Sequence, residues 1–368
     1  MTQPPTVSAG ISGSSPSVTE AGLDHMGALF DVAAPKVSAA EASALALSLF
    51  GLAGTAKPLT GERDSNFHLS AESGDGYVLK VIHPAEEESV TDFQSRVLLH
   101  ISAADPALAT PQLIKTLDGQ IHGVWRRADE APRAVRCLTY LPGRPLHLAP
   151  KTAAQRANLG TFLGRLDRAL QGFSHPAQNH DLIWDMKRSV RLLPMLDELP
   201  DPERRALPVW ALEQFRDRVL PRLDDLRCQV IHNDFNPHNV LADGEDGDVI
   251  SGIIDFGDMV YGPLIQDLAT AAAYQVTPEG HPLQGPLDMI AAFHAVLPLS
   301  ELEMELLPVM LATRLAMTIS ISSWRARRHP DNAAYIQRNQ GAAWSGLERL
   351  RHLPAGEAAA WLSQHLSR

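Results

Sequence analysis

The sequence contains the stretch His232-Asn233-Asp234-Phe235-Asn236-Pro237-His238-Asn239, and Asp255-Phe256-Gly257 follows it further along the chain. In this H-x-D-x-x-x-x-N pattern before D-F-G, the Asp234 carboxylate can accept or orient the proton of an attacking hydroxyl. The amide oxygen of Asn239 and the carboxylate of Asp255 are oxygen ligands suited to Mg²⁺ against a triphosphate. The combination therefore predicts phosphoryl transfer, a reaction that depends on positioning and charge neutralisation.

Each of these residues also has an ordinary structural use. His232 suits a packed interior, Asp234 and Asn239 are common turn formers, and the Asp255-Phe256-Gly257 tripeptide suits a plain turn. What favours chemistry over structure is the set of residues at this spacing.

Composition and charge narrow the classes of protein that this chain can be. Its 368 residues are 45% hydrophobic and 20% charged, which is typical of a globular protein with room for two lobes. The formal net charge of −11 argues against a broad nucleic-acid-binding surface and against an anionic membrane as partner. We expect no membrane helix, because no apolar run approaches the required length, and no secretory signal at the first residues.

Two cysteines, Cys137 and Cys228, form neither a metal-binding spacing nor a disulfide framework. A reducing cytoplasm is the simplest setting for such a chain, with both cysteines as small core residues.

Residue patterns divide the chain into a tail and two lobes. Residues 1–20 are rich in Ser, Pro, Gly and Thr, which predicts a disordered tail. Residues 21–141 are expected to form an N-terminal nucleotide-binding lobe, with a small antiparallel sheet and one long helix at 90–102. A short helix opens this lobe at 38–50, and the expected strands are 66–69, 77–82, 113–117, 121–126 and 135–141.

The character of the sequence changes after Pro142-Gly143-Arg144-Pro145, which we interpret as a hinge. Residues 142–368 are expected to form a mostly helical C-terminal lobe that carries the catalytic loop and the acceptor site. The expected helices are 152–170, 208–226, 265–274, 286–296, 300–323 and a final long one at 332–350, and the expected strands are 229–232, 240–241 and 249–254. The fold class is therefore α+β.

The motifs resemble those of the aminoglycoside phosphotransferase branch of the protein-kinase-like fold, over roughly residues 38–350. Three stretches of sequence are more similar to one sub-branch than to the rest of the family. This sub-branch contains hydroxylysine kinases and the kinase-like domains fused to class III aminotransferases. These stretches are Gly61-Glu62-Arg63-Asp64-Ser65-Asn66-Phe67, Tyr140-Leu141-Pro142-Gly143, and Ser251-Gly252-Ile253-Ile254-Asp255-Phe256-Gly257-Asp258-Met259-Val260-Tyr261. The resemblance implies a bilobal fold, a small-molecule acceptor, and ATP or GTP as phosphate donor with Mg²⁺.

The resemblance also implies residues that bind the nucleotide. Lys80, between apolar neighbours in a strand pattern, is expected to pair with the α and β phosphates. Gln94 occupies the helix slot in which protein kinases have a glutamate, and its amide can still accept a hydrogen bond from Lys80. The nearby alternatives for this slot are Glu86, Glu87, Glu88 and Asp92. The 61–66 segment stands where a phosphate-covering loop belongs, so the Ser65 hydroxyl and the Asn66 amide are expected to reach a phosphate. A plain polar hairpin remains the alternative for this segment.

The acceptor is less defined by sequence than the donor. Asp258 suits either a substrate ammonium group or a structural cap, and Asp267 is expected to fix the catalytic loop. Candidate pocket walls are Trp184-Asp185, Arg314 and Trp324-Arg325, because an arginine pair suits an amino-acid carboxylate.

Three functions remain open on the sequence. The first is a kinase for a small amine or amino acid, with 5-hydroxylysine as the leading acceptor. The second is a kinase for another acceptor, such as an aminoglycoside, homoserine or choline. The third is a non-catalytic kinase-like nucleotide-binding module, which only the glutamine at position 94 supports.

Overall fold

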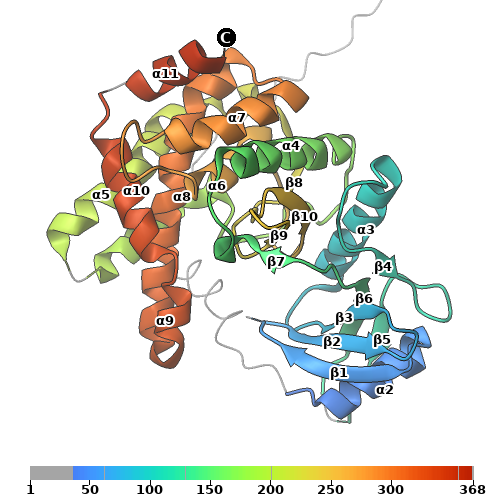
Figure 1. Ribbon diagram of the computed structural model, residues 1–368. Helices are drawn as coiled ribbons and strands as arrows, with labels where there is room; N and C mark the ends of the chain where they lie inside the picture. Colours follow the sequence, from blue (N-terminus) through green and yellow to red (C-terminus); the bar gives the residue numbers. More distant parts are fainter. Residues whose placement is uncertain (1–35, 62, 129, 200, 355, 367–368) are drawn as a thin grey trace, which may run out of the picture. The chain divides into compact units, whose positions relative to one another are not determined.

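The computed structural model describes residues 36–366, apart from Glu62, Asp129, Pro200 and Ala355. The tail expected at residues 1–20 lies outside the described residues. Sheet and helix segregate along the described chain: the strands of the large sheet come first and most of the helices follow (Figure 1).

The N-terminal lobe is built on an antiparallel sheet of six strands. Its order is β1-β2-β3-β6-β4, and the short β5 also pairs with β6. Hairpin connections join β1 to β2 and β2 to β3, as the polar turns in the sequence predict. The strands are β1 (Gly54–Leu59), β2 (Ser65–Ala71), β3 (Gly76–Val81), β4 (Leu113–Ile114), β5 (Gly123–Trp125) and β6 (Arg133–Thr139).

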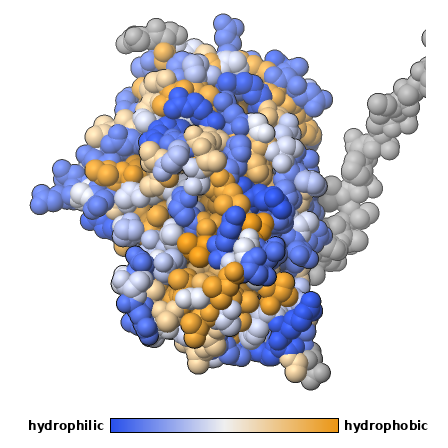
Figure 2. Space-filling model, turned by 90° about the vertical axis from the view of Figure 1, so that its right-hand side faces the viewer, coloured by the Kyte–Doolittle hydropathy of each residue, from blue (hydrophilic) through white to orange (hydrophobic). Residues whose placement is uncertain are grey.

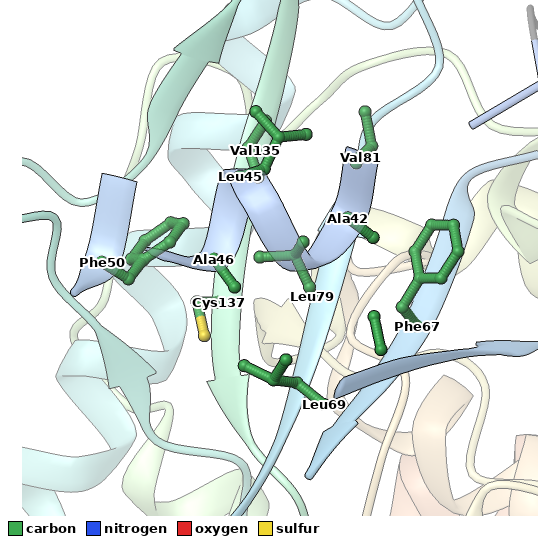
Figure 3. Packing of buried hydrophobic residues seen from close by; sticks show 11 residues of the cluster. Ala42, Leu45, Ala46, Phe50, Phe67, Leu69, Leu79, Val81, Val135 and Cys137 are labelled. Atoms are coloured by element: carbon green, nitrogen blue, oxygen red, sulfur yellow. The ribbon is translucent and has the colours of Figure 1, made fainter. Parts of the chain in front are cut away.

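One face of this sheet is apolar and lies under helix α2 (Ala39–Phe50). Ser38 and Glu41 form a capping box at the start of α2, in which each side chain binds the backbone N–H of the other residue. The buried core between helix and strands includes Phe67, Leu79 and Cys137 (Figure 3). This apolar contact fixes which face of the sheet is left for the site.

The opposite face carries a polar row across three strands. Asn66 in β2 pairs with Lys80 in β3, and Lys80 pairs with Arg136 in β6. Residues directly opposite one another in neighbouring strands have their side chains on the same face. Helix α3 (Glu88–Ala104) meets this row, because its Gln94 contacts Arg136.

The connection between the lobes passes through Gly143. Its φ is 146°, and a Cβ there would lie 2.6 Å from Ser251 Oγ, so only glycine fits. Directly after Gly143, β7 (Arg144–Pro145) pairs with β9 in a three-stranded sheet of order β10-β9-β7. A separate two-stranded sheet is formed by β8 and β11. The further strands are β8 (Cys228–Ile231), β9 (Val240–Asp243), β10 (Val249–Ile253) and β11 (Val260–Pro263).

The rest of the C-terminal lobe is helical. It contains the α-helices α4 (Ala153–Ala169), α5 (Pro202–Gln214), α6 (Leu264–Ala273), α7 (Gln284–Val296), α8 (Glu301–Arg328), α9 (Ala333–Ile336), α10 (Gln340–Arg351) and α11 (Glu357–Leu366). The 3₁₀ segments are η1 (Leu146–Leu148), η2 (Met186–Glu198), η4 (Leu220–Asp225) and η5 (Pro330–Asn332), and η3 (Phe215–Val219) is a π-helical segment.

Helix α8 is the central helix of this lobe. Its length and a mean hydropathy of 1.4 would allow it to cross a membrane by length and composition alone, although Arg314 interrupts its apolar run. However, 89% of its apolar window is buried inside the protein, as is typical of a core helix. On the face shown in Figure 2, hydrophobic residues are interspersed with hydrophilic ones rather than gathered in a continuous belt.

Several expected elements differ in extent. The strands expected at 113–117 and 121–126 shrink to β4 and β5, and β11, η2 and α11 were not expected. The helix expected at 208–226 begins six residues earlier, at Pro202 behind the Asp201 cap, and gives way to π and 3₁₀ turns after Gln214. The final long helix expected at 332–350 is divided into α9 and α10. Both cysteines are free, with Cys137 buried and Cys228 only half-buried.

Candidate active site

The catalytic loop connects β8 to β9 and is fixed by a buried carboxylate. The Asp267 carboxylate in α6 accepts hydrogen bonds from the backbone N–H groups of His232 and Asn233, each at 2.8 Å. The His232 ring is fully buried and packs edge-on against Phe256 at 4.7 Å between centroids. Burial lowers the pKa of His232, so the ring is neutral near pH 7 and braces the loop.

Asn233 holds the loop in an uncommon backbone conformation. Its φ is 66°, which L residues adopt only at a cost unless their surroundings fix it. The Asn233 Nδ2 group donates to the backbone oxygens of Trp184 (3.3 Å) and Asp258 (3.0 Å), and its Oδ1 accepts from Gln266 (2.8 Å). Both the nitrogen and the oxygen of the Asn233 amide are therefore hydrogen-bonded, which fixes the backbone position of the next residue, Asp234.

Asp234 is held through both carboxylate oxygens. Asn236 Nδ2 (2.9 Å) and Arg314 (3.2 Å) donate to Oδ1, and Asn239 Nδ2 donates to Oδ2 at 2.6 Å. Burial and the neighbouring Asp258 raise the pKa of Asp234 to about 7, against the lowering effect of Arg314. A carboxylate with a pKa near neutrality is well matched to accepting a hydroxyl proton.

Asn239 and Asp255 present oxygen atoms that suit a magnesium ion. Because the nitrogen of the Asn239 amide donates to Asp234, its oxygen is the atom left for a metal. The backbone N–H of Ile254 donates to Asn239 O at 2.9 Å, which ties the two ligand-bearing segments together. One carboxylate and one amide oxygen, completed by phosphate oxygens and water, fit the octahedral preference of Mg²⁺.

The Asp255 side chain is about half exposed (54%) although its surroundings are crowded with charge. The partial burial of Asp255 acts to raise its pKa, but the positive charges of Lys80 and Arg63 outweigh this effect and hold the pKa below its usual range. Asp255 is therefore ionised near neutral pH and available as a ligand. Its backbone φ of 64° makes it, with Asn233, one of two non-glycine residues with positive φ in the part of the chain that the structure describes.

Lys80 lies between two carboxylates. Its ammonium is 3.8 Å from Asp255 Oδ1 and 3.8 Å from Asp64 Oδ2, and Asp64 is itself fixed by the backbone N–H of His83. The expected phosphate-binding lysine thus faces the expected metal ligand. A triphosphate entering here would meet an ammonium that is already in position.

Gln94 has partners other than the Lys80 expected from the sequence. Its Oε1 accepts a hydrogen bond from Arg136 at 2.9 Å, and its Nε2 donates to Gly257 O at 3.2 Å. The expectation of a Gln94–Lys80 hydrogen bond was therefore wrong. The reason is that Arg136, the cross-strand neighbour of Lys80, takes the acceptor end of the amide.

Ser65 and Asn66 lie at the start of β2 rather than in a free loop. The Ser65 hydroxyl oxygen accepts a hydrogen bond from Arg133 at 3.4 Å, which leaves its own O–H able to donate, so contact of Ser65 with a phosphate stays a prediction. Asn66 shares the polar face with Lys80, and its buried Oδ1 has no hydrogen-bond partner among the described residues. Contact of Asn66 with a phosphate stays a prediction.

Arg314 of α8 lies against Asp234. This side chain is only 3% exposed, donates to the Tyr274 hydroxyl at 3.3 Å, and lies 4.6 Å from the centre of the Trp184 ring. Trp184 and Arg314 therefore meet beside Asp234, and their role as walls of an acceptor pocket stays a prediction. Trp324 is buried beneath the Arg328 guanidinium instead.

Some functional neighbours could not be identified from the sequence. Arg136 and Asn236 contact Gln94 and Asp234, and the sequence analysis assigned neither a role. Alternation in β6 does place Arg136 and Leu138 on one face and Val135 and Cys137 on the other. The missing information was the register that sets Arg136 beside Lys80.

The chain is similar in sequence to proteins of known family. The profile of the Phosphotransferase enzyme family matches residues 55–292. Hydroxylysine kinase of Mus musculus is 28% identical over 341 residues, which cover 86% of this chain and 90% of the mouse protein.

Solved structures show the same fold. A microcompartment-associated aminopropanol kinase has a TM-score of 0.62 at 19% identity and covers 88% of this chain and 97% of its own. An amicoumacin kinase in complex with AMP-PNP and Ca²⁺ has a TM-score of 0.59 at 14% identity, and the match covers 78% of this chain and 87% of that kinase. The expected protein-kinase-like α+β fold is thereby confirmed.

Proposed function

Because the chain belongs to the phosphotransferase enzyme family, we propose that this small-molecule kinase transfers the terminal phosphate of ATP or GTP to the hydroxyl of an amino acid, with 5-hydroxylysine as the leading acceptor. The observation that carries the proposal is Asp234, held by Asn236, Asn239 and Arg314 beside the Asn239–Asp255 ligand pair. Because both cysteines are free, we place the activity in the cytoplasm.

On the donor side, the protein supplies fixed charge. Lys80 neutralises the α and β phosphates, and Asn239 and Asp255 would hold the magnesium ion. A magnesium ion held there would supply positive charge that stabilises the charge building up on the phosphates. Asp64 now pairs with Lys80, and we expect the phosphates to replace that contact on binding.

On the acceptor side, Asp234 orients the hydroxyl and receives its proton. The hydroxyl oxygen forms a bond to the γ-phosphorus, and the bond between that phosphorus and the β–γ bridging oxygen breaks in line with it. The nucleoside diphosphate leaves with the bridging oxygen. Asn236, Asn239 and Arg314 keep the carboxylate in the required orientation, so little reorganisation is needed.

The charges around Asp234 favour a zwitterionic acceptor over a polycation. The Arg314 guanidinium, buried and 3.2 Å from Asp234, is a fixed positive charge at the reacting centre. An aminoglycoside would need several carboxylates there, whereas an amino acid needs an anion and a cation. Asp258, whose charge raises the pKa of Asp234, is the candidate partner for an ammonium group.

A nucleoside-diphosphate release assay tests this proposal. ATP and GTP are supplied separately with Mg²⁺ and a panel of acceptors: 5-hydroxylysine, homoserine, choline, ethanolamine and kanamycin. We expect 5-hydroxylysine to give the highest kcat/KM, and its analogue without the carboxylate to be at least tenfold poorer. Preference for kanamycin or choline would overturn the choice of acceptor. Nucleotide binding with no release for any acceptor would favour the non-catalytic module instead.

A further inference from the structure

Gln94 connects three parts of the molecule through one amide. It belongs to α3, its oxygen accepts from Arg136 in β6 at 2.9 Å, and its nitrogen donates to Gly257 O at 3.2 Å. Gln94 and Arg136 are both buried, at 6% and 2% exposure. The N-terminal sheet and helix are thus joined directly to the turn that follows Asp255.

This turn needs support from outside itself. Asp255 has a φ of 64°, and strained backbone of this kind persists only when neighbouring groups fix it. The Gly257 carbonyl lies two residues beyond Asp255, and the Gln94 bond comes to it from the other lobe. Loss of that bond would allow the turn to relax, and the Asp255 carboxylate would move with it.

We propose that Gln94 is a positioning residue for Asp255 and that Arg136 orients its amide. This inference rests on the proposed role of Asp255 as a magnesium ligand. Gln94 acts through Gly257 and does not touch the nucleotide. The hydrogen bonds of Gln94 replace an ion pair between α3 and Lys80. The Lys80 ammonium is therefore available to Asp64 and Asp255, each at 3.8 Å, and to the phosphates.

The chemistry of the link explains why an amide stands here and not a carboxylate. A glutamate could accept from Arg136, but it has no N–H to donate to Gly257 O when ionised. It would also place negative charge beside a carbonyl oxygen and near Asp255. Of the two side chains of this size and shape, only the glutamine amide can accept at one end and donate at the other.

Arg136 determines which end of the amide faces Gly257. Its guanidinium is completely enclosed, and burial lowers its pKa to about 10, which still leaves it charged at neutral pH. Among the described residues, its Nε and one terminal nitrogen have no hydrogen-bond partner. A buried cation so poorly satisfied is costly to keep for stability alone, which points to a functional use.

Titration calorimetry with AMP-PNP and with GMP-PNP, each with Mg²⁺ and with EDTA, tests this role. In wild type, Mg²⁺ should increase the affinity for the better nucleotide. In Gln94→Met and Gln94→Glu, we expect this increase to fall on the order of tenfold, the effect of losing one buried hydrogen bond, while the affinity in EDTA is unchanged. Turnover should fall with an unchanged KM for the acceptor, because Asp234 is unaffected.

Gln155→Met is the matched control. Gln155 is 1% exposed and donates to a glycine carbonyl, Gly247 O at 2.9 Å, away from the site, so its loss should leave the Mg²⁺ effect at the wild-type value. Arg136→Met should weaken the Mg²⁺ effect as Gln94→Met does, and the double variant should be no worse than either.

A wild-type Mg²⁺ effect in Gln94→Glu would overturn the inference, since a glutamate cannot make the bond to Gly257. Gln94→Glu also keeps the size and shape of the side chain, so it decides the matter even where Gln94→Met fails to fold. If wild type shows no Mg²⁺ effect at all, the proposed function itself fails. An effect in wild type that both variants retain contradicts only the role of Gln94.

Discussion

At the scale of single residues, the site is an arrangement of opposite charges that fix one another. Asp255 lies against Lys80, and Asp234 lies against Arg314, so each carboxylate has a cation that holds its orientation. The two differ in environment. The pKa of Asp255 is held low, as a metal ligand requires, whereas the pKa of Asp234 is raised to about 7, as suits a proton acceptor.

Replacement of Asp234 by asparagine tests the assignment of the proton acceptor. Asn keeps the shape of the side chain but cannot take up a proton, so we expect kcat to fall by about 10² to 10⁴-fold. Affinity for the nucleotide with Mg²⁺ should stay within about twofold, because Lys80, Asn239 and Asp255 are intact. Steady-state kinetics and calorimetry on the same preparation measure both. Turnover close to wild type would remove Asp234 from this role.

The proposed catalytic and metal-binding residues can be selected from the sequence where a single segment contains them. Asp234 and Asn239 are five residues apart in one loop, and Asp255 follows β10, which pairs with β9, the strand after that loop. The partners of Gln94 were not predictable. They depend on the pairing of β3 with β6 and on the approach of α3 to Gly257, which are contacts between distant segments.

At the scale of elements, close packing of helices explains a glycine that local propensity would disfavour. Gly160 lies in α4, where a Cβ would come 2.0 Å from the backbone oxygen of Met289 in α7. Backbone cannot move aside as a side chain can, so glycine allows the two helices to meet at this distance. Gly341, near the start of α10, has nothing within 4 Å.

Alanine at these two glycines should have opposite effects on stability. Gly160→Ala forces α4 and α7 apart, and we expect the free energy of unfolding to fall by about 3 kcal/mol or more. Gly341→Ala adds helix propensity without a clash and should raise it by roughly 0.5–1 kcal/mol. Urea unfolding followed by circular dichroism measures both. Equal effects of the two substitutions would mean that α4 and α7 do not pack as described.

Helices and strands were predictable where a local periodicity or a local cap specifies them. The ends of an element were not predictable where contacts with distant parts of the chain determine them. Ser38 and Glu41 predict the start of α2 because the capping box is a local structure. The break between α9 and α10 has a different origin. Arg338 and Asn339 in that break contact His238 of the catalytic loop, and no pattern within 332–350 reveals this contact.

At the scale of the whole molecule, stability depends on an acid pair in the interior. Asp167 of α4 and Asp267 of α6 are both 0% exposed, and neither Asp167 oxygen has a donor partner among the described residues. Burial, and then the neighbouring Asp267, raise the pKa of Asp167 well above its usual range. A proton kept on Asp167 completes the contact with the carboxylate that fixes the catalytic loop.

This pair predicts a pH dependence of stability. The pKa of Asp167 is higher in the folded protein than in the unfolded chain, where it is about 3.9. Its contribution to the free energy of unfolding is therefore complete below pH 3.9 and is lost as the pH rises toward the folded pKa, at up to about 1.4 kcal/mol per pH unit. Asp167→Asn supplies a permanent donor to Asp267 and removes this loss. We expect the stability of the variant relative to wild type to increase between pH 5 and pH 8, measured by urea unfolding at each pH. A difference that does not change with pH would show that Asp167 is ionised in the folded protein.

We propose that Asp234 directs the transfer of a nucleotide phosphate to the hydroxyl of an amino acid. The most direct measurement is ³¹P NMR of a reaction containing 5-hydroxylysine, Mg²⁺ and ATP or GTP, with wild type and Asp234→Asn in parallel. We predict a phosphate monoester resonance coupled to the hydroxyl-bearing carbon in wild type, formed in step with the nucleoside diphosphate and absent from the variant on the same time scale. Release of inorganic phosphate without the monoester, or equal product with the variant, would contradict the account.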